Sequence, residues 1–171
     1  MKRLLILVCP IFLVTIARSQ DIKPTTFILV RHAEKGDDGT KDPLLSDDGV
    51  KRAARLVEVL QETKVTAIYS TNYKRTKNTV TQVAQAKGLE VKTYEPMKED
   101  ELKRIIELNK GGTVLIVGHS NTTPWTANFL SGEKLKNFTD AEYGNILIVT
   151  YWESGLPAAP AGKASLIRLN Y

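Results

Sequence analysis

The sequence predicts an α/β protein, a three-layer α/β/α sandwich with a largely parallel central sheet. Short apolar, β-rich runs alternate along the chain with longer segments whose apolar residues recur at helical spacing. Capping residues and glycines stand where one pattern changes into the other. The 171 residues, 42% of them hydrophobic, suffice for one buried core, and no internal repeat or second domain is visible.

The first strand is expected at Thr26–Val30, a short β-rich run of the buried type. A helix is expected next, because Ser46 followed by Asp47 and Asp48 is typical of an N-cap with an acidic first turn. Helical spacing predicts that the core-facing side chains of this helix are Val50, Ala53, Ala54, Val57 and Leu60. The second strand is expected at Val65–Tyr69.

The middle of the chain continues the alternation. A helix is expected over Tyr73–Lys87, with Gly88 as its stop, and a short strand over Leu89–Tyr94. The next helix is expected over Lys98–Asn109, because its apolar residues fall on one face and two glycines follow it closely.

The strand at Thr113–Val117 is the most clearly buried run. The helix after it is expected to be capped by Thr122 or Thr123, with Pro124 at its first position and Gly132 as its stop. A Gly/Pro/Ala-rich segment predicts a hairpin-like return between the last two strands. The two strands and the linker are expected at Asn145–Tyr151, Ala164–Leu169 and 155–162.

Residues 1–19 are typical of a cleaved secretion signal. Lys2 and Arg3 form a basic start, and the apolar stretch Leu4–Ile16 is shorter than the ~20 residues that a membrane-spanning helix needs. Small residues then precede a cleavage point before Gln20. We expect a signal peptide at 1–19 and one domain at 20–171, periplasmic or secreted, with no stable membrane anchor after cleavage.

Composition excludes several classes of protein. The leader removes three of the 24 basic residues and none of the 19 acidic ones, so the net charge falls from +5 to +2 and nucleic acid is not an expected partner. Cys9 lies in the leader, which leaves the mature chain without a thiol nucleophile. Two histidines exclude a three-histidine metal site, and nucleotide-binding glycine motifs are absent, so no cofactor is expected.

Both histidines of the chain follow a predicted strand directly. His32 stands after the first strand with Arg31 before it, and His119 stands after Thr113–Val117. Because ligands of open α/β sheets collect outside the carboxyl ends of the strands, the two imidazoles are expected to face one crevice. Arg75 follows another strand, and guanidinium groups suit phosphate. Together with a helix N-terminus near Thr122, these groups predict a phosphate cradle.

Four segments resemble motifs of the histidine phosphatase superfamily, the phosphoglycerate mutase-like proteins. They occur in the family's order over about residues 26–130, and the short chain resembles the short bacterial branch. The segments are Arg31-His-Ala-Glu34 (R-H-[GA]-E), Asp42-Pro-Leu-Leu-Ser-Asp-Asp-Gly49 (D-x-x-L-[ST]-x-x-G), Ser70 to Thr76 (S-S-x-x-x-R-[AT]) and Gly118-His-Ser120 (G-H-[SG]).

The resemblance implies a phosphoglycerate mutase-like fold and a role for each matching residue. His32 is the nucleophile that attacks phosphorus and becomes a phosphohistidine, and His119 holds the transferring phosphoryl group. Arg31 and Arg75 bind the phosphate oxygens, so no metal is needed. Ser120 and Asn121 are further candidates for substrate binding.

A proton donor for the leaving group is expected after the third strand, where such members of the family place an acid. Glu95 is the first candidate and Asp100 the second. The alternative is that the acids of this region stabilise the N-terminus of the helix at 98–109.

The function that follows is an extracytoplasmic, metal-independent phosphatase acting on a phosphate monoester or related phosphoryl compound. Mutase-type phosphoryl transfer is one alternative, and a non-catalytic phosphate-binding protein on the same scaffold is another. A metal-dependent hydrolase using His32, His119 and a carboxylate is a third. The sequence names neither the substrate nor the oligomeric state.

Overall fold

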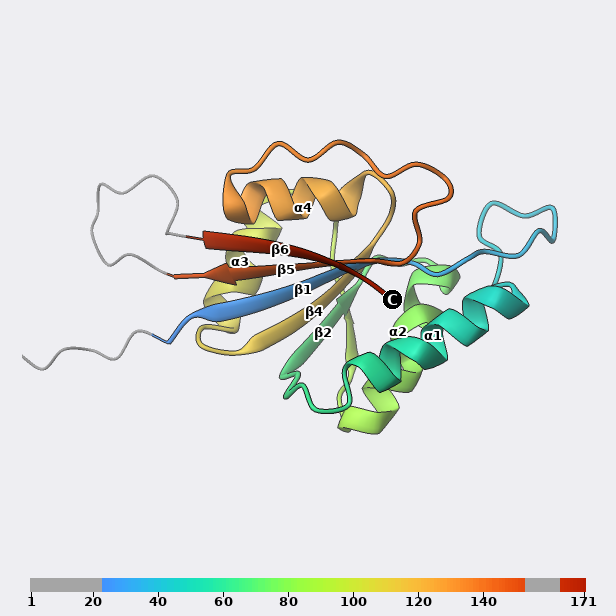
Figure 1. The fold of residues 1–171 in the computed structure, drawn as a ribbon, viewed down its shortest axis with the longest axis horizontal. Coiled ribbons are helices and arrows are strands. Elements are labelled where there is room, and N and C mark those ends of the chain that lie inside the picture. Colours follow the sequence, from blue (N-terminus) through green and yellow to red (C-terminus); the bar gives the residue numbers. More distant parts are fainter. Residues whose placement is uncertain (1–22, 153–163) are drawn as a thin grey trace, which may run out of the picture.

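The computed structural model describes residues 23–152 and 164–171, which form a sheet with helices on both faces (Figure 1). The predicted leader at 1–19 and the linker at 155–162 lie outside the described residues. The described elements are, in chain order, β1 (Thr25–Arg31), α1 (Asp47–Val59), β2 (Ala67–Ser70), α2 (Lys74–Lys87), β3 (Val91–Thr93), α3 (Glu99–Leu108), β4 (Thr113–Gly118), α4 (Thr122–Ser131), β5 (Asn145–Tyr151) and β6 (Ala164–Asn170).

The sheet has the order β3-β2-β4-β1-β5-β6. The first four strands in this order run parallel, whereas β5 pairs antiparallel with β1, and β6 pairs antiparallel with β5. The largely parallel sheet predicted from the alternating patterns is therefore confirmed. In the register of β1 with β4, Arg31 stands opposite Gly118, so the residues after these two strands emerge side by side.

Alternate residues of each central strand face opposite layers of helices. Phe27 and Leu29 of β1 pack in one core cluster with residues of α3 and α4. Ile28 and Val30 pack in a second cluster with residues of α1 and α2. Since successive side chains of a strand point to opposite faces, a fully apolar run is what a strand between two helical layers requires. The three-layer sandwich is confirmed.

Three details of the predicted elements were wrong. The strand expected at Leu89–Tyr94 is limited to β3, and Pro124 is the third residue of α4 rather than its first. Val50 is 49% exposed although it was expected to face inward. The buried stripe of α1 instead begins at Gly49 and continues through Ala53 and Leu56. Because glycine has no side chain, the first position of this stripe was invisible in the hydrophobic pattern.

Gly49 lets the start of α1 approach the chain that leaves β1. A Cβ atom at this position would lie well inside van der Waals contact with the carbonyl oxygen of Glu34. Ser46 caps the helix, because its hydroxyl accepts a hydrogen bond from the Gly49 N–H at 3.1 Å. The Ser46 N–H in turn donates to the Glu34 carbonyl at 3.0 Å. The serine and glycine of this motif therefore hold the segment after His32 in place.

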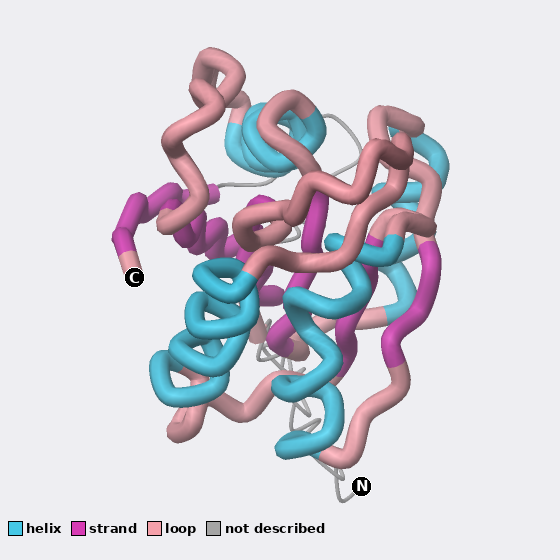
Figure 2. The backbone as a smooth tube through the Cα atoms, turned by 90° about the vertical axis from the view of Figure 1, so that its right-hand side faces the viewer, coloured by secondary structure: helices cyan, strands magenta, loops and turns pink. Residues whose placement is uncertain are grey.

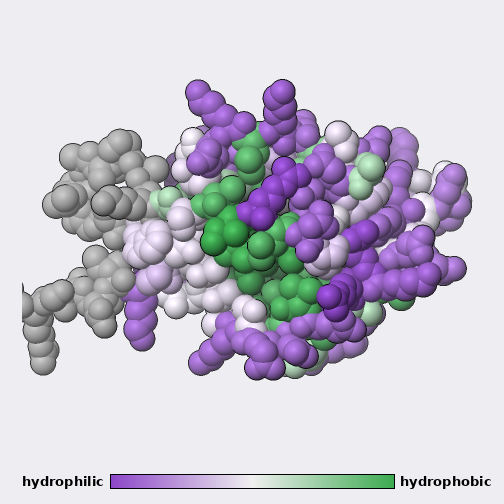
Figure 3. Space-filling model, in the orientation of Figure 1, coloured by the Kyte–Doolittle hydropathy of each residue, from purple (hydrophilic) through white to green (hydrophobic). Residues whose placement is uncertain are grey.

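The surface is polar over most of the face seen in Figure 3, with apolar side chains gathered over the edge strand β6. Ile167 and Leu169 of β6 are among the exposed large apolar residues. No helix within the described ranges has both the length and the apolar content needed to cross a membrane.

Candidate active site

The motif segments converge where the parallel strands end, at the end of the sheet that faces the viewer in Figure 2. Arg31 ends β1 and His32 follows it, while Gly118 ends β4 and His119 follows it. Arg75 lies in the first turn of α2. The ring centroids of the two histidines are 5.4 Å apart. The two histidines and the two arginines line one pocket of about 790 Å³.

His32 is held in a defined tautomer. Its Nδ1 atom lies 2.8 Å from the carbonyl oxygen of Ala33. Since a carbonyl oxygen only accepts hydrogen bonds, Nδ1 carries the proton in the neutral ring and Nε2 keeps a free lone pair. Burial, together with the positive charges of Arg31 and Arg75, lowers the pKa of His32 to about 4. The ring is therefore neutral at neutral pH.

Ala33, the residue whose carbonyl accepts this hydrogen bond, is itself held through its N–H. The Ala33 N–H donates to Thr79 Oγ1 at 2.9 Å, and the Thr79 hydroxyl donates to the Arg75 carbonyl at 2.8 Å. Thr79 is fully buried on α2. The motif comparison did not single out this residue, although its place four positions after Arg75 puts it on the same helix face.

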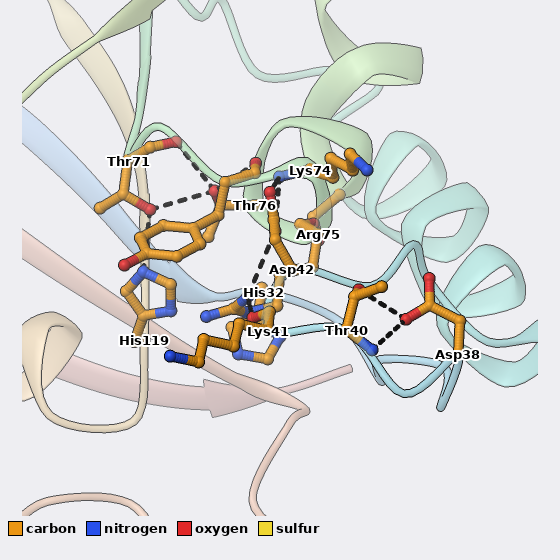
Figure 4. A network of polar contacts seen from close by, with 12 residues as sticks. His32, Asp38, Thr40, Lys41, Asp42, Thr71, Lys74, Arg75, Thr76 and His119 are labelled. Carbon is orange, nitrogen blue, oxygen red and sulfur yellow. Dashed lines mark hydrogen bonds and ion pairs between the residues drawn. The ribbon is translucent and has the colours of Figure 1, made fainter.

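His119 is oriented by a chain of hydroxyl groups (Figure 4). Its Nε2 atom lies 2.9 Å from Thr71 Oγ1, which lies 3.0 Å from Thr76 Oγ1. The Thr76 hydroxyl lies 2.9 Å from the carbonyl oxygens of Thr71 and Tyr73 and can donate only to them. Thr71 therefore donates to Thr76, His119 Nε2 donates to Thr71, and Nδ1 of His119 is left unprotonated. Neither threonine was singled out from the sequence.

The environment of His119 also favours the neutral ring. Burial, together with the positive charges of Arg75 and Arg31, lowers its pKa to about 4. The edge of the Tyr73 ring packs against the imidazole at a centroid distance of 4.9 Å. The two histidines thus share one pocket as neutral rings in opposite tautomers, with Nε2 free on His32 and Nδ1 free on His119.

Arg31 is fixed by a distant loop. Its side chain is buried, and Nη1 donates to the Thr139 carbonyl at 2.7 Å. The guanidinium carbon lies 4.0 Å from the centroid of the Tyr143 ring. Tyr143 also lines the pocket, which was not predicted. The segment before β5 therefore sets the orientation of Arg31, the residue directly before His32.

Arg75 is fixed by the second motif. Its Nη1 atom lies 3.3 Å from Asp42 Oδ1, and its guanidinium carbon lies 4.4 Å from the centroid of the Tyr73 ring. The Asp42 carboxylate also accepts from the backbone N–H of Lys74 at 3.0 Å, which is the first residue of α2. Asp42 therefore stabilises the helix N-terminus and orients the arginine beside it.

Ser120 and Asn121 line the pocket, as do Pro96 and Met97 from the segment after β3. Thr122 was expected to cap α4, but the structure places Asn121 at the N-cap, and the Thr122 hydroxyl accepts from the His119 N–H at 2.7 Å. This contact holds the backbone of His119 at the start of the helix.

The structure does not bring Glu95 into this pocket. Its side chain is 68% exposed, pairs with Lys98, and borders a neighbouring hollow together with Asp100. The chain turns at Met97, whose φ of 60° is left-handed, and Met97 itself lines the pocket. The carboxylate among the residues that line the pocket is that of Asp140, 3.9 Å from Arg31 Nη2.

Within the described residues, no group of three or more His, Cys, Asp or Glu side chains lies close enough together to hold a metal ion. Glu34 is not part of the pocket lining. Both of its carboxylate oxygens accept hydrogen bonds from Arg52 at 2.7–2.9 Å.

Residues 27–102 match the family model of the histidine phosphatase superfamily, branch 1. This span contains Arg31, His32 and Arg75 in the positions described above. Over this part of its length the chain resembles the histidine phosphatase superfamily. His119 lies beyond the matched span and joins the site through the register of β1 with β4.

In an alignment of 90 residues, which covers 49% of this chain, the protein is 42% identical to phosphoserine phosphatase 1 of Hydrogenobacter thermophilus. The matched segment spans 39% of that relative. The fold is similar to that of a SixA protein from Nakamurella multipartitia, with a TM-score of 0.64, 24% identity and coverage of 86% of this chain and 96% of that one.

Two further structures share the fold of this protein. The protein histidine phosphatase SixA complexed with tungstate has a TM-score of 0.67 at 17% identity, over 85% of this chain and 96% of that one. A mycobacterial glucosyl-3-phosphoglycerate phosphatase complexed with VO3 has a TM-score of 0.62 at 16% identity, over 85% of this chain and 98% of that one.

The lowered pKa values of the two imidazoles can be measured by NMR. We expect both rings of the free protein to protonate near pH 4 instead of at the ordinary 6.5. Between these values the unfolded chain binds protons that the folded rings do not, so the free energy of unfolding should decrease as the pH falls from 6.5 towards 4. The chain has two histidines, so a His32→Ala variant assigns the remaining signal. Protonation of either ring near 6.5 would contradict this description.

Proposed function

We propose that this protein is a phosphatase that hydrolyses a phosphate monoester or a related phosphoryl compound through a phosphohistidine on His32, without a metal ion. The observation that carries the proposal is the state of His32, a buried neutral imidazole whose Nε2 is free. Two fixed guanidinium groups and a second imidazole share its pocket. The names of the phosphatase relative and of the oxyanion-bound fold neighbours support the same chemistry.

In the first step, the lone pair of His32 Nε2 forms a P–N bond while the P–O bond to the leaving group breaks and the leaving oxygen takes a proton. The phosphorylated ring keeps its proton on Nδ1, where the Ala33 carbonyl accepts it. Arg31 and Arg75 neutralise the phosphoryl oxygens as charge shifts during the transfer. In the second step, water forms a new P–O bond, the P–N bond breaks, and inorganic phosphate leaves a neutral His32.

Trapping of the phosphoenzyme tests this mechanism. Quenching during turnover of p-nitrophenyl phosphate should give a base-stable, acid-labile phosphate on His32, located by mass spectrometry, in the presence of EDTA. The variant His32→Ala should lose activity by at least about a thousandfold, because it removes the nucleophile while leaving the sheet intact. Arg55→Ala, on the exposed side of α1, serves as a matched control with unchanged activity.

Three results would each reject a part of the proposal. Activity in His32→Ala would exclude His32 as the nucleophile. Loss of all activity in EDTA, restored by a divalent cation, would favour the metal-dependent alternative. Phosphoryl return to a bound product in place of release of phosphate would favour the mutase alternative.

We propose Asp140 as the proton donor to the leaving group, because among the described residues it is the carboxylate that lines the pocket. Glu95, the first candidate from the sequence, borders the neighbouring hollow. We expect Asp140→Asn to lower kcat/KM about tenfold or more for an alkyl phosphate and less for an aryl phosphate, whose leaving group needs little protonation. Glu95→Gln should change neither by more than about twofold. The reverse pattern would return the role to Glu95.

We also propose that the protein acts outside the cytoplasm, in the periplasm or as a secreted protein. The support is the composition of residues 1–19 alone, a basic start followed by an apolar stretch and a small-residue cleavage point. Expression of the full chain in a bacterial host should yield a mature protein that begins at Gln20 and appears in the osmotic-shock fraction. An intact N-terminus in the cytoplasmic fraction would reject the leader.

A further inference from the structure

Two lysines, Lys35 and Lys41, line the pocket beside the arginines. Within the described residues, neither ammonium group has an ion pair or a hydrogen bond to a side chain or carbonyl. Several other lysines of this protein, by contrast, are paired with acids close by in sequence. Such pairs are Lys51 with Asp48, Lys98 with Glu95, and Lys110 with Glu107.

Both lysines belong to the loop 35–45, which follows the R-H-A-E motif. Lys35 bridges to Leu45, and the Gly36 N–H donates to the Leu44 carbonyl at 2.9 Å, so the loop closes on itself at its base. The backbone of Lys35 is therefore held near the rim of the pocket while its side chain remains free to bind.

The other end of the loop is held by the second motif. The Lys41 carbonyl accepts from Arg75 Nη1 at 3.4 Å, and the next residue, Asp42, accepts from the Lys74 N–H. In Figure 4 the side chain of Lys41 extends past His32 towards His119. A flexible lysine on an anchored backbone needs little reorganisation to meet an anion in the pocket.

The acids of the same loop form hydrogen bonds within the loop. Asp37 accepts from the Gly39 N–H at 3.3 Å, and Asp38 accepts from the backbone and hydroxyl of Thr40 at 2.9 Å and 2.6 Å. Neither carboxylate lines the pocket, and Figure 4 shows Asp38 on the side of the loop away from the imidazoles. The loop thus presents its cations, and not its anions, to the pocket.

We infer that Lys35 and Lys41 form a second anion subsite, which binds a carboxylate or a second phosphate carried by the leaving part of the substrate. Arg31 and Arg75 already supply the fixed donors that a transferring phosphoryl group requires. Two further cations without partners in the same pocket are explained by a substrate with a second negative group a few atoms from the ester. This inference rests on the proposed phosphatase function and narrows its substrate class to phosphorylated acids and bisphosphates.

Matched substrate pairs test the subsite. 3-Phosphoglycerate and glycerol 3-phosphate differ by a carboxylate, and fructose 1,6-bisphosphate and fructose 6-phosphate differ by a phosphate. The wild type should prefer the more anionic member of at least one pair in kcat/KM. Lys41→Met or Lys35→Met should each reduce this preference about fivefold, and less at high salt, because exposed charge pairs are screened. The pair whose preference changes identifies the anion as carboxylate or phosphate.

Lys51→Met is the control, since this lysine is paired with Asp48 on α1 and does not line the pocket. It should leave both preferences at their wild-type values. Preferences that are unchanged in Lys35→Met, Lys41→Met and the double variant would overturn the subsite.

Binding constants separate this inference from the proposed function. The same substrate pairs are titrated calorimetrically into His32→Ala, with and without the lysine substitutions. If the wild type hydrolyses none of the four compounds but the lysines still favour the more anionic ligand, hydrolysis fails and the subsite stands. If the ligands of each pair bind equally with and without the lysines, the subsite fails whether or not the wild type is active.

Discussion

The pocket depends on one hydrogen bond, from His32 Nδ1 to the carbonyl of Ala33 at 2.8 Å. This bond fixes the proton on one nitrogen and leaves the other free, which is what a phosphorylated histidine requires. The backbone on both sides of this carbonyl is held. Thr79 of α2 accepts from the Ala33 N–H, and the next carbonyl, that of Glu34, accepts from the Ser46 N–H just before α1. Two helices of one layer therefore hold the chain on either side of the carbonyl that orients His32.

The charges of the pocket have two effects. Arg31 is oriented mainly by backbone carbonyls of the segment before β5, which carry no net charge, and its contact with the carboxylate of Asp140 is long, at 3.9 Å. The positive charges of Arg31 and Arg75 help to lower the pKa values of His32 and His119. In the proposed mechanism, the same two cations bind the phosphate group and keep His32 unprotonated. A carboxylate close to His32 would favour the imidazolium ion and weaken both effects.

The fold could be predicted because strands and helices leave different patterns in the sequence. The buried strands are short, continuous apolar runs, and the segments between them have apolar residues at helical spacing. The convergence of His32 and His119 was predicted from their places directly after two strands, and it arises from the parallel pairing of β1 with β4. The partners of Arg31 could not be predicted, because backbone carbonyls give no sequence signal and the residues before β5 have no periodicity. The position of Glu95 outside the pocket could not be predicted either, because an acid that pairs with a lysine three residues later looks the same in sequence as one that lines a site.

Asp42 connects the parts of the site that sequence distance separates. Its carboxylate stabilises the first turn of α2, pairs with Arg75, and anchors the loop on which Lys41 stands. Asp42 does not line the pocket, and these contacts explain why the motif has an aspartate at this position. Because α2 also carries Thr79, which holds Ala33, a shift of this helix N-terminus would disturb Arg75 and the surroundings of His32 together. One helix therefore holds Arg75, the backbone beside His32 and the end of the loop 35–45. Among the described residues it contributes a single side chain, Arg75, to the pocket lining.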